Sequence, residues 1–94
     1  MEVVRTIADL RQRISSWRIE GQTVCLVPTM GALHDGHLSL IKIAQEKCDR
    51  LVASIFVNPK QFLPNEYFEK YPRNEDSDIE KLVELGTDLL FSPN

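Results

Sequence analysis

The 94-residue sequence has no long apolar run and no cluster of basic residues. The most apolar stretch, residues 51–57, is interrupted by Ser54 and is far shorter than the ~20 residues of a membrane span. The first residues lack a basic segment followed by an apolar core, so we expect no secretion signal. The formal net charge is −3, which disfavours a nucleic-acid surface. These absences predict no membrane partner, no nucleic-acid partner and a cytoplasmic location.

Cysteine is also scarce, since Cys25 and Cys48 are the only two. Without a secretion signal we expect both as free thiols, with Cys25 packed as a small core residue in an apolar stretch. The hydrophobic fraction of 43% and the charged fraction of 27% are ordinary for a globular chain and argue against disorder.

Helical periodicity alternates with short apolar runs along the chain. Ile7, Leu10, Ile14 and Trp17 share one face of a first predicted helix, which Thr6 and Asp9 cap and Gly21 ends. Further helices are predicted over residues 37–48 and 75–85. The first of these buries Leu38, Ile41, Ala44 and Cys48, and the second, with Asn74 as its cap and Gly86 as its stop, buries Ile79, Leu82 and Val83.

Three strands are predicted over residues 23–27, 51–57 and 88–92, the first ended by Pro28 and the second by Asn58-Pro59. The first two are apolar enough to be covered on both faces. Strands that alternate with helices predict a three-layer α/β fold with a parallel sheet, in which the strands lie in the order third, second, first, as in half of a Rossmann-like domain. Ligands of such sheets bind beyond the carboxyl ends of the strands, which indicates the turn after Val27 and the loop after Val57.

The turn after Val27 carries two histidines, His34 and His37, at the start of a predicted helix. Helix N-termini favour anions, and imidazole donates hydrogen bonds to phosphate oxygens. Gly36 and Gly31 leave room for a ligand to approach the main chain. This pattern favours phosphoryl chemistry on a nucleotide.

Two other interpretations of the histidine pair stay open at this point. Ordinary surface histidines at a helix start fit the spacing equally well. Zinc binding is disfavoured, because no third and fourth ligand accompany the pair in a ligand-like spacing.

A second candidate site follows the predicted strand 51–57. Asn58 and Gln61 are polar groups beside Phe62, which suits a small polar metabolite, although a turn-capping Asn and an exposed Gln fit the spacing better. Tyr71 and Arg73 form a weaker candidate. The acidic residues of the last helix are interpreted as a solvated face: Glu75, Asp76, Asp78 and Glu80.

Three segments together closely resemble the pantothenate synthetase (pantoate–β-alanine ligase) family, in the order residues 27–37, 54–62 and 71–73. The resemblance implies a two-step ligase: the carboxylate of pantoate attacks the α-phosphorus of ATP, and β-alanine then displaces AMP from the adenylate. It also implies Mg²⁺ accompanying ATP as co-substrate, and a homodimer. Leu63 departs from the glycine expected there.

Carried over by motif, the resemblance assigns the ATP site to Met30, Gly31, Ala32, Leu33, His34, Asp35, Gly36 and His37. His37 and His34 would be the catalytic residues, and Gln61, with Asn58 and Tyr71, would bind pantoate; no resident metal ligand is implied. Family members are longer, so residues 1–94 are expected to be the N-terminal portion of the nucleotide-binding domain, without its second half or the C-terminal domain, and inactive alone. The alternatives are another HIGH-type nucleotidyltransferase with a different acceptor, and a non-catalytic fragment that self-associates.

Overall fold

The computed structural model describes residues 1–56 and 75–93. Strands and helices alternate along them: β1 (Glu2–Val4), α1 (Ile7–Ile19), β2 (Val24–Thr29), α2 (Asp35–Gln45), β3 (Arg50–Ile55), α3 (Glu75–Glu84) and β4 (Leu89–Phe91).

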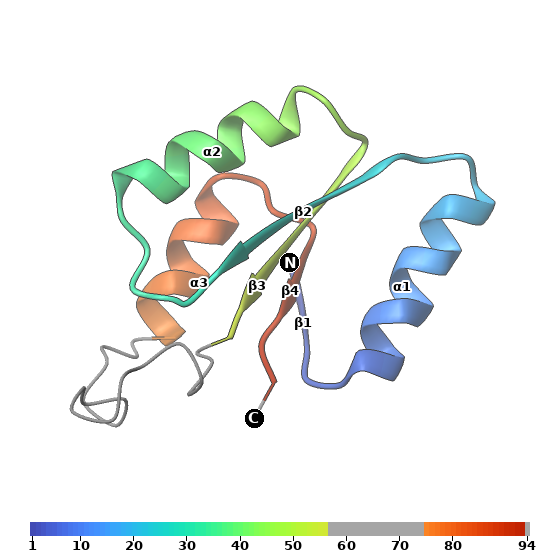
Figure 1. The fold of residues 1–94 in the computed structure, drawn as a ribbon, viewed down its shortest axis with the longest axis horizontal. Helices are drawn as coiled ribbons and strands as arrows, with labels where there is room; N and C mark the ends of the chain where they lie inside the picture. Colours follow the sequence, from blue (N-terminus) through green and yellow to red (C-terminus); the bar gives the residue numbers. More distant parts are fainter. Residues whose placement is uncertain (57–74, 94) are drawn as a thin grey trace, which may run out of the picture.

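The strands form one sheet in the order β1-β4-β3-β2, and every neighbouring pair is parallel. Helices α2 and α3 lie on one side of the sheet and α1 lies on the other (Figure 1). The predicted three-layer α/β fold is therefore confirmed, as is the order of the three predicted strands. Strand β1 was not predicted, because three residues are too few for a periodic pattern.

Strand β2 runs through Pro28, so the prediction that this proline ends the strand is wrong. The carbonyls of Thr23 and Thr29 both accept hydrogen bonds from the β3 side, and backbone groups alternate sides along a strand. Pro28 therefore presents its missing N–H to the open side of β2, where no bond with β3 is lost. Proline is tolerated in an edge strand for this reason.

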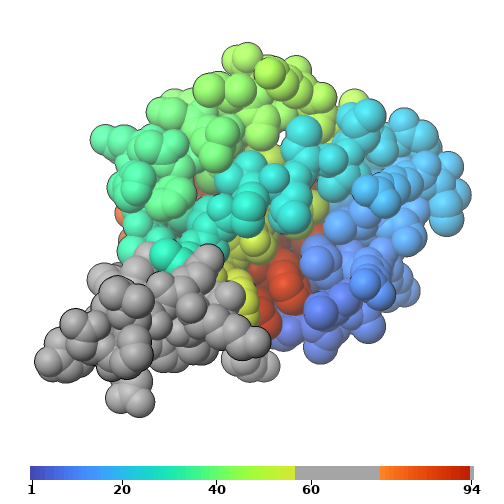
Figure 2. All heavy atoms as spheres, viewed as in Figure 1, coloured from blue at the N-terminus to red at the C-terminus, as the bar shows by residue number. Residues whose placement is uncertain are grey.

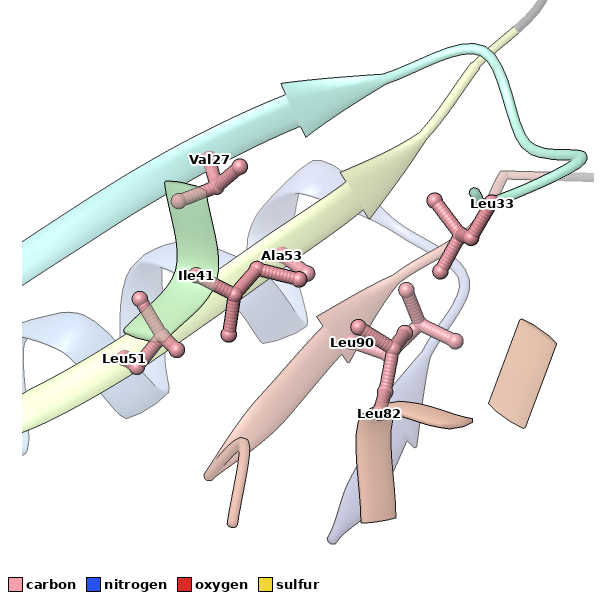
Figure 3. Close-up of a cluster of buried hydrophobic side chains, with 7 residues drawn as sticks. All are labelled: Val27, Leu33, Ile41, Leu51, Ala53, Leu82 and Leu90. Carbon is pink, nitrogen blue, oxygen red and sulfur yellow. The ribbon is translucent and has the colours of Figure 1, made fainter. Parts of the chain in front are cut away.

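The main core lies between the sheet and helices α2 and α3 (Figure 3). Ile41 of α2 and Leu82 of α3 are both fully buried there, against strand residues. The buried members of this cluster are Val27, Leu33, Ile41, Leu51, Ala53, Leu82 and Leu90. Because Leu33 belongs to the cluster, the core reaches directly under the turn that carries the two histidines.

Helix α1 covers the other face, and its cap is as predicted, since Thr6 Oγ1 accepts the Asp9 N–H at 3.1 Å. Leu10, Ile14 and Trp17 pack there against a smaller cluster, which contains Val4, Val52 and Leu89. Ile7 shares the predicted face but is 58% exposed, so this face is only partly covered among the described residues.

Part of the sheet face on the α1 side stays open. Leu26 is 57% exposed and Phe56 is 53% exposed. Atoms of β3 and β4 reach the surface between β2 and α1 in the space-filling view (Figure 2). The prediction that β2 is covered on both faces is therefore wrong for the described residues, because α1 leaves Leu26 exposed.

The helix ends differ slightly from those predicted. Helix α2 begins at Asp35 and ends at Gln45, although Cys48 still packs against the main core. Gly21 and Gly86 follow α1 and α3 with positive φ, as the predicted stops require. Val83 is 51% exposed, so its predicted burial is wrong: α3 packs through Leu82, one position away on the helix surface.

Both cysteines are free thiols that pack against the main core, as expected of Cys25. Burial raises the pKa of the Cys48 thiol to about 11. None of the helices in the described ranges is both long enough and apolar enough to cross a membrane.

Candidate nucleotide site

The turn between β2 and α2 lies at the carboxyl edge of the sheet (Figure 1). Its backbone is unusual, since Gly31 has φ +85° and Ala32 has φ +51°. Thr29 fixes the start of the turn: its hydroxyl donates to the Ser54 carbonyl at 2.9 Å and accepts the Gly31 N–H at 3.2 Å. The turn is therefore tied to the end of strand β3 before it reaches the helix.

His34 is the N-cap of α2, and His37 closes the same turn of helix. Nδ1 of His34 accepts the Gly36 N–H at 3.1 Å, and Nδ1 of His37 accepts the His34 N–H at 3.3 Å. This reciprocal arrangement is a capping box in which imidazoles replace the usual hydroxyl and carboxylate. The ring centroids are 4.1 Å apart, so the pair lies on one side of the turn, as the sequence predicted.

The capping box determines which ring nitrogen carries the proton. A neutral imidazole has one donor and one acceptor nitrogen, and in both residues Nδ1 is the acceptor. Each neutral ring therefore carries its proton on Nε2. Burial lowers the pKa of His37 and the charge of His34 lowers it further, while Asp78 raises it. Near neutral pH, His37 is a hydrogen-bond donor without a positive charge.

The space at the two glycines of the turn is filled by the protein itself. A Cβ on Gly36 would lie 2.9 Å from Cε1 of His34, and one on Gly31 would lie 3.2 Å from Cγ2 of Ile55. The expectation that these glycines leave room for a ligand is therefore wrong. Gly36 makes room for the His34 ring, and Gly31 makes room for side chains of β3 and α3.

Asp78 of α3 is a residue of the site that the sequence interpretation missed. It is 2% exposed, and its carboxylate accepts the Ala32 N–H at 3.0 Å and the Leu33 N–H at 2.9 Å. The prediction that Asp78 belongs to a solvated face is wrong. Its position four residues before Leu82, on the buried face of α3, was the available signal.

The neighbouring acids divide into two groups. Asp76 and Glu80 are exposed, as predicted. Glu75 forms a salt bridge of 2.6 Å with Arg5, the residue after β1. It also accepts a hydrogen bond from the Ser92 hydroxyl at 3.0 Å. These hydrogen bonds lower the pKa of Glu75, the larger effect coming from Arg5. The pair ties the start of α3 to the carboxyl edge of the sheet.

The main-chain anion site expected at this turn is smaller than predicted. Asp78 already occupies the N–H groups of Ala32 and Leu33, and His37 occupies that of His34. The N–H groups of Asp35 and His37 belong to the first helical turn, which has no intrahelical acceptors. An anion at this edge therefore meets the two Nε2–H groups and the first turn of α2.

Several predicted site residues lie outside the described residues: Asn58, Gln61, Phe62, Leu63, Tyr71, Arg73 and the cap Asn74. Within residues 1–56 and 75–93, no three His, Cys, Asp or Glu side chains are grouped so as to hold a metal ion. The described part of the site thus consists of the histidine pair, the first turn of α2 and the α3 residues behind them.

Comparison with known proteins identifies the family. A sequence model described as pantoate-beta-alanine ligase matches residues 2–94. The pantothenate synthetase of Caulobacter vibrioides is 55% identical over 92 residues, 98% of this chain and 32% of its own length. That of Alcanivorax borkumensis is 52% identical over 94 residues, 33% of its own length. The chain thus spans about a third of the curated relatives that it matches.

Solved structures agree with the sequence comparison. Pantothenate synthetase from Thermus thermophilus superposes with a TM-score of 0.87 at 44% identity, over all of this chain and 32% of that one. Pantoate-beta-alanine ligase from Francisella tularensis, crystallised with beta-gamma ATP and beta-alanine, superposes with a TM-score of 0.90 at 44% identity, over 99% of this chain and 35% of its own. The fold, the histidine turn and the family match over residues 2–94 lead to one conclusion: the chain belongs to the pantoate–β-alanine ligase family.

Proposed function

We propose that this chain supplies the ATP-binding turn of an enzyme that joins pantoate to β-alanine. The observation that carries the proposal is the capping box, which points the Nε2–H groups of His34 and His37 away from the helix backbone. Two neighbouring donors at a helix N-terminus suit the phosphates of a nucleotide. The ATP complex of the Francisella tularensis relative supports the same substrate.

In the first step a pantoate carboxylate oxygen bonds to the α-phosphorus of ATP, and pyrophosphate leaves with the electrons of the broken P–O bond. A carboxylate with a pKa near ~4 is already ionised at neutral pH, so the step needs no general base. It needs the two reactants in line and the growing phosphate charge stabilised. His34 and His37 serve the second need by donating hydrogen bonds from Nε2, and the motif assigns the role of proton donor to His37 in its protonated form.

In the second step the neutral β-alanine amine attacks the carbonyl carbon of the adenylate. The bond between this carbon and the AMP oxygen breaks, AMP leaves with its electrons, and the amine nitrogen loses one proton as the amide forms. Residues 30–37 would line the ATP side of the site. Gln61, with Asn58 and Tyr71, would hold pantoate beside it. These assignments follow from the motifs, and the family match over residues 2–94 supports them.

The remaining features of the proposal concern the whole protein. Mg²⁺ would enter with ATP as part of the substrate. The chain would form the N-terminal portion of the nucleotide-binding domain in a cytoplasmic homodimer. Its match to about a third of each relative supports its being one part of a longer enzyme.

A chimera tests the function directly. Residues 1–94 replace the matching 92 residues of the Caulobacter vibrioides relative, with which they share 55% identity. We expect release of AMP and pyrophosphate that requires ATP, pantoate and β-alanine together. In the His37→Ala chimera turnover should fall at least about a hundredfold, as on loss of one transition-state donor. The chain alone should show little or no turnover.

Each outcome decides between functions. Pyrophosphate release with another acid but not with pantoate would favour a nucleotidyltransferase with a different acceptor. A folded chimera without any adenylation, although the parent relative is active, would contradict the proposal. Robust turnover by the chain alone would contradict the expectation that it is inactive by itself.

A self-associating role is the second candidate, because β2 is an edge strand among the described residues and its own Leu26 is 57% exposed. Exposed edges invite strand pairing. Light scattering over a range of concentrations separates the two: a monomer at every concentration would exclude self-association and leave the ligase role unaffected.

A further inference from the structure

We propose that Asp78, assisted by Lys81, is the positioning residue that fixes the turn at residues 31–33 and thereby aims His34 and His37. The role rests on the proposed function of the histidine pair, but its structural part can be tested without any nucleotide. Asp78 contacts neither histidine through a hydrogen bond, so it acts through the backbone between them and α3.

The carboxylate of Asp78 binds the turn with both oxygens. Oδ2 accepts the Ala32 N–H at 3.0 Å and Oδ1 accepts the Leu33 N–H at 2.9 Å. The side chain is 2% exposed, so these bonds are shielded from water. Charge-assisted hydrogen bonds of this kind are stronger than neutral ones, and two in parallel also fix orientation.

The turn needs such a constraint because of its backbone conformation. Gly31 and Ala32 both have positive φ, at +85° and +51°. An L residue such as Ala32 adopts this region rarely and only where its surroundings demand it. The two N–H groups that Asp78 binds belong to Ala32 itself and to the residue that follows it. An anionic acceptor at residue 78 therefore stabilises a backbone conformation that the turn would otherwise leave.

Lys81 completes the contact from the next turn of α3. Its Nζ donates to the Leu33 carbonyl at 2.9 Å, so both backbone groups of Leu33 are held from one helix. The Leu33 side chain is 4% exposed and lies in the main core with Leu82. The next residue along the chain is His34, whose backbone position sets both bonds of the capping box.

A carboxylate is the suitable group at residue 78 because both of its oxygens accept. An asparagine would have to turn an NH₂ donor towards one of the two N–H groups, leaving that group unpaired in a buried place. The charge of Asp78 also raises the pKa of His37, which opposes the lowering of that pKa by burial. Two further charged groups belong to the elements that hold the turn: Asp35 in the first turn of α2, and Lys81 of α3, which donates to the Leu33 carbonyl.

The test uses the 94-residue chain, whose two histidines give two separate ring resonances by nuclear magnetic resonance. Asp78→Asn is compared with Asp76→Asn, the same change at an exposed position of α3. In Asp78→Asn we expect about tenfold less protection of the Ala32 and Leu33 amides from hydrogen exchange, shifted His34 and His37 ring signals and a lower pKa of His37. Amides of Leu51 and Leu90 should stay protected, and Asp76→Asn should change none of these signals.

Lys81→Met gives a second test if Asp78→Asn fails to fold. It removes one contact and keeps the apolar stem of the side chain, so we expect the same signals to shift in a folded chain, by less. Unchanged ring signals and amide protection in folded Asp78→Asn, or in Lys81→Met when Asp78→Asn is unfolded, would overturn the positioning role.

Titration with inorganic triphosphate then links the two proposals. We expect Asp78→Asn to weaken binding about tenfold relative to Asp76→Asn, the same factor by which it loosens the turn. If the unaltered chain fails to bind triphosphate while the amide and ring signals respond as expected, the proposed function of the histidines is contradicted and the positioning by Asp78 stands. If triphosphate binds equally to both variants, the positioning role is contradicted and the proposed function stands.

Discussion

The backbone N–H of His34 donates to Nδ1 of His37 at 3.3 Å, and the two rings lie 4.1 Å apart between centroids. Because His34 in turn accepts the Gly36 N–H, each imidazole is both a helix cap and a donor facing outward. The same residues therefore start helix α2 and offer hydrogen bonds to a ligand. Any change in their protonation must affect both roles together.

Both rings should be in the Nε2–H tautomer when neutral. The reason is that Nδ1 of each accepts a backbone N–H and so cannot carry a proton. Long-range ¹H–¹⁵N correlation spectra at pH 8 distinguish the two ring nitrogens directly. The urea-unfolded chain is the control, since its rings have no such constraint. A dominant Nδ1–H tautomer at either residue in the folded chain would contradict the capping box.

The stability of the chain should decrease as the pH falls below the ordinary histidine pKa. Burial, and secondarily the charge of His34, lowers the pKa of His37 from its ordinary value of 6.5. The unfolded state then binds a proton more readily than the folded state, so the contribution of neutral His37 is complete above pH 6.5 and is lost as the pH falls through the lower folded pKa. Protonation at Nδ1 would also remove its bond with His34.

Urea unfolding between pH 5 and 8 measures this effect, with His37→Gln as the matched variant. Glutamine at this position of a capping box can still accept the backbone N–H of the cap residue, but it does not titrate. The free energy of unfolding of His37→Gln should therefore depend less on pH over this range. Equal slopes for the two chains would show that His37 is not linked to folding.

The local part of the site was predictable from the sequence, because its signals are local. The turn at a helix start and the pair at positions 34 and 37 depend on neighbouring residues only, and the structure places both rings on one side. The sheet order followed from alternation of strands and helices. The roles of Gln61, Asn58 and Tyr71 stay predictions, since they lie outside the described residues.

The long-range contacts of the site were not predictable, although the buried face of α3 was. Asp78 is 46 residues from Ala32 in sequence, and the acidic residues around it are typical of a solvated face. Only the folded chain shows that the acid on the buried side of α3 meets two backbone donors. The prediction that Pro28 ends its strand failed for a related reason. Whether a proline ends a strand depends on whether its missing N–H faces a neighbouring strand.

Gly36→Ala should weaken triphosphate binding more than it affects stability. The new Cβ would lie 2.9 Å from Cε1 and 3.1 Å from Nδ1 of His34, so the ring must turn away and its cap bond is lost. That loss costs about 1 kcal/mol, and the better helix propensity of alanine returns about as much. We expect an unfolding free energy within about 1 kcal/mol of the parent. Inorganic triphosphate should bind at least about fivefold more weakly than to the parent.

Ser39→Ala is the control for that change, because it lies on an exposed position of the same helix. It should alter neither measurement. Triphosphate binding to Gly36→Ala that matches the parent, with shifted His34 signals, would show that His34 does not contact the ligand. Unshifted His34 signals would contradict the close approach itself.

Two isoleucines of α2 test how the helix is held under the site. Ile41 is fully buried in the main core, whereas Ile43 is 51% exposed. Ile41→Ala should lower the free energy of unfolding by about 2–5 kcal/mol, because it removes buried methyl groups and leaves a cavity. Ile43→Ala should lower it by less than about 1 kcal/mol, since that side chain is already half in water.

A chain of this size has about 5–15 kcal/mol of stability in total, so Ile41→Ala could leave little folded protein to measure. Ile41→Val removes a single methylene, and its expected loss of about 0.5–1.5 kcal/mol keeps the comparison measurable by urea unfolding. If Ile41→Val and Ile43→Val destabilise the chain equally, then α2 does not pack through Ile41. The histidine turn would then lack the rigid support that Leu33 and Ile41 provide together in one cluster.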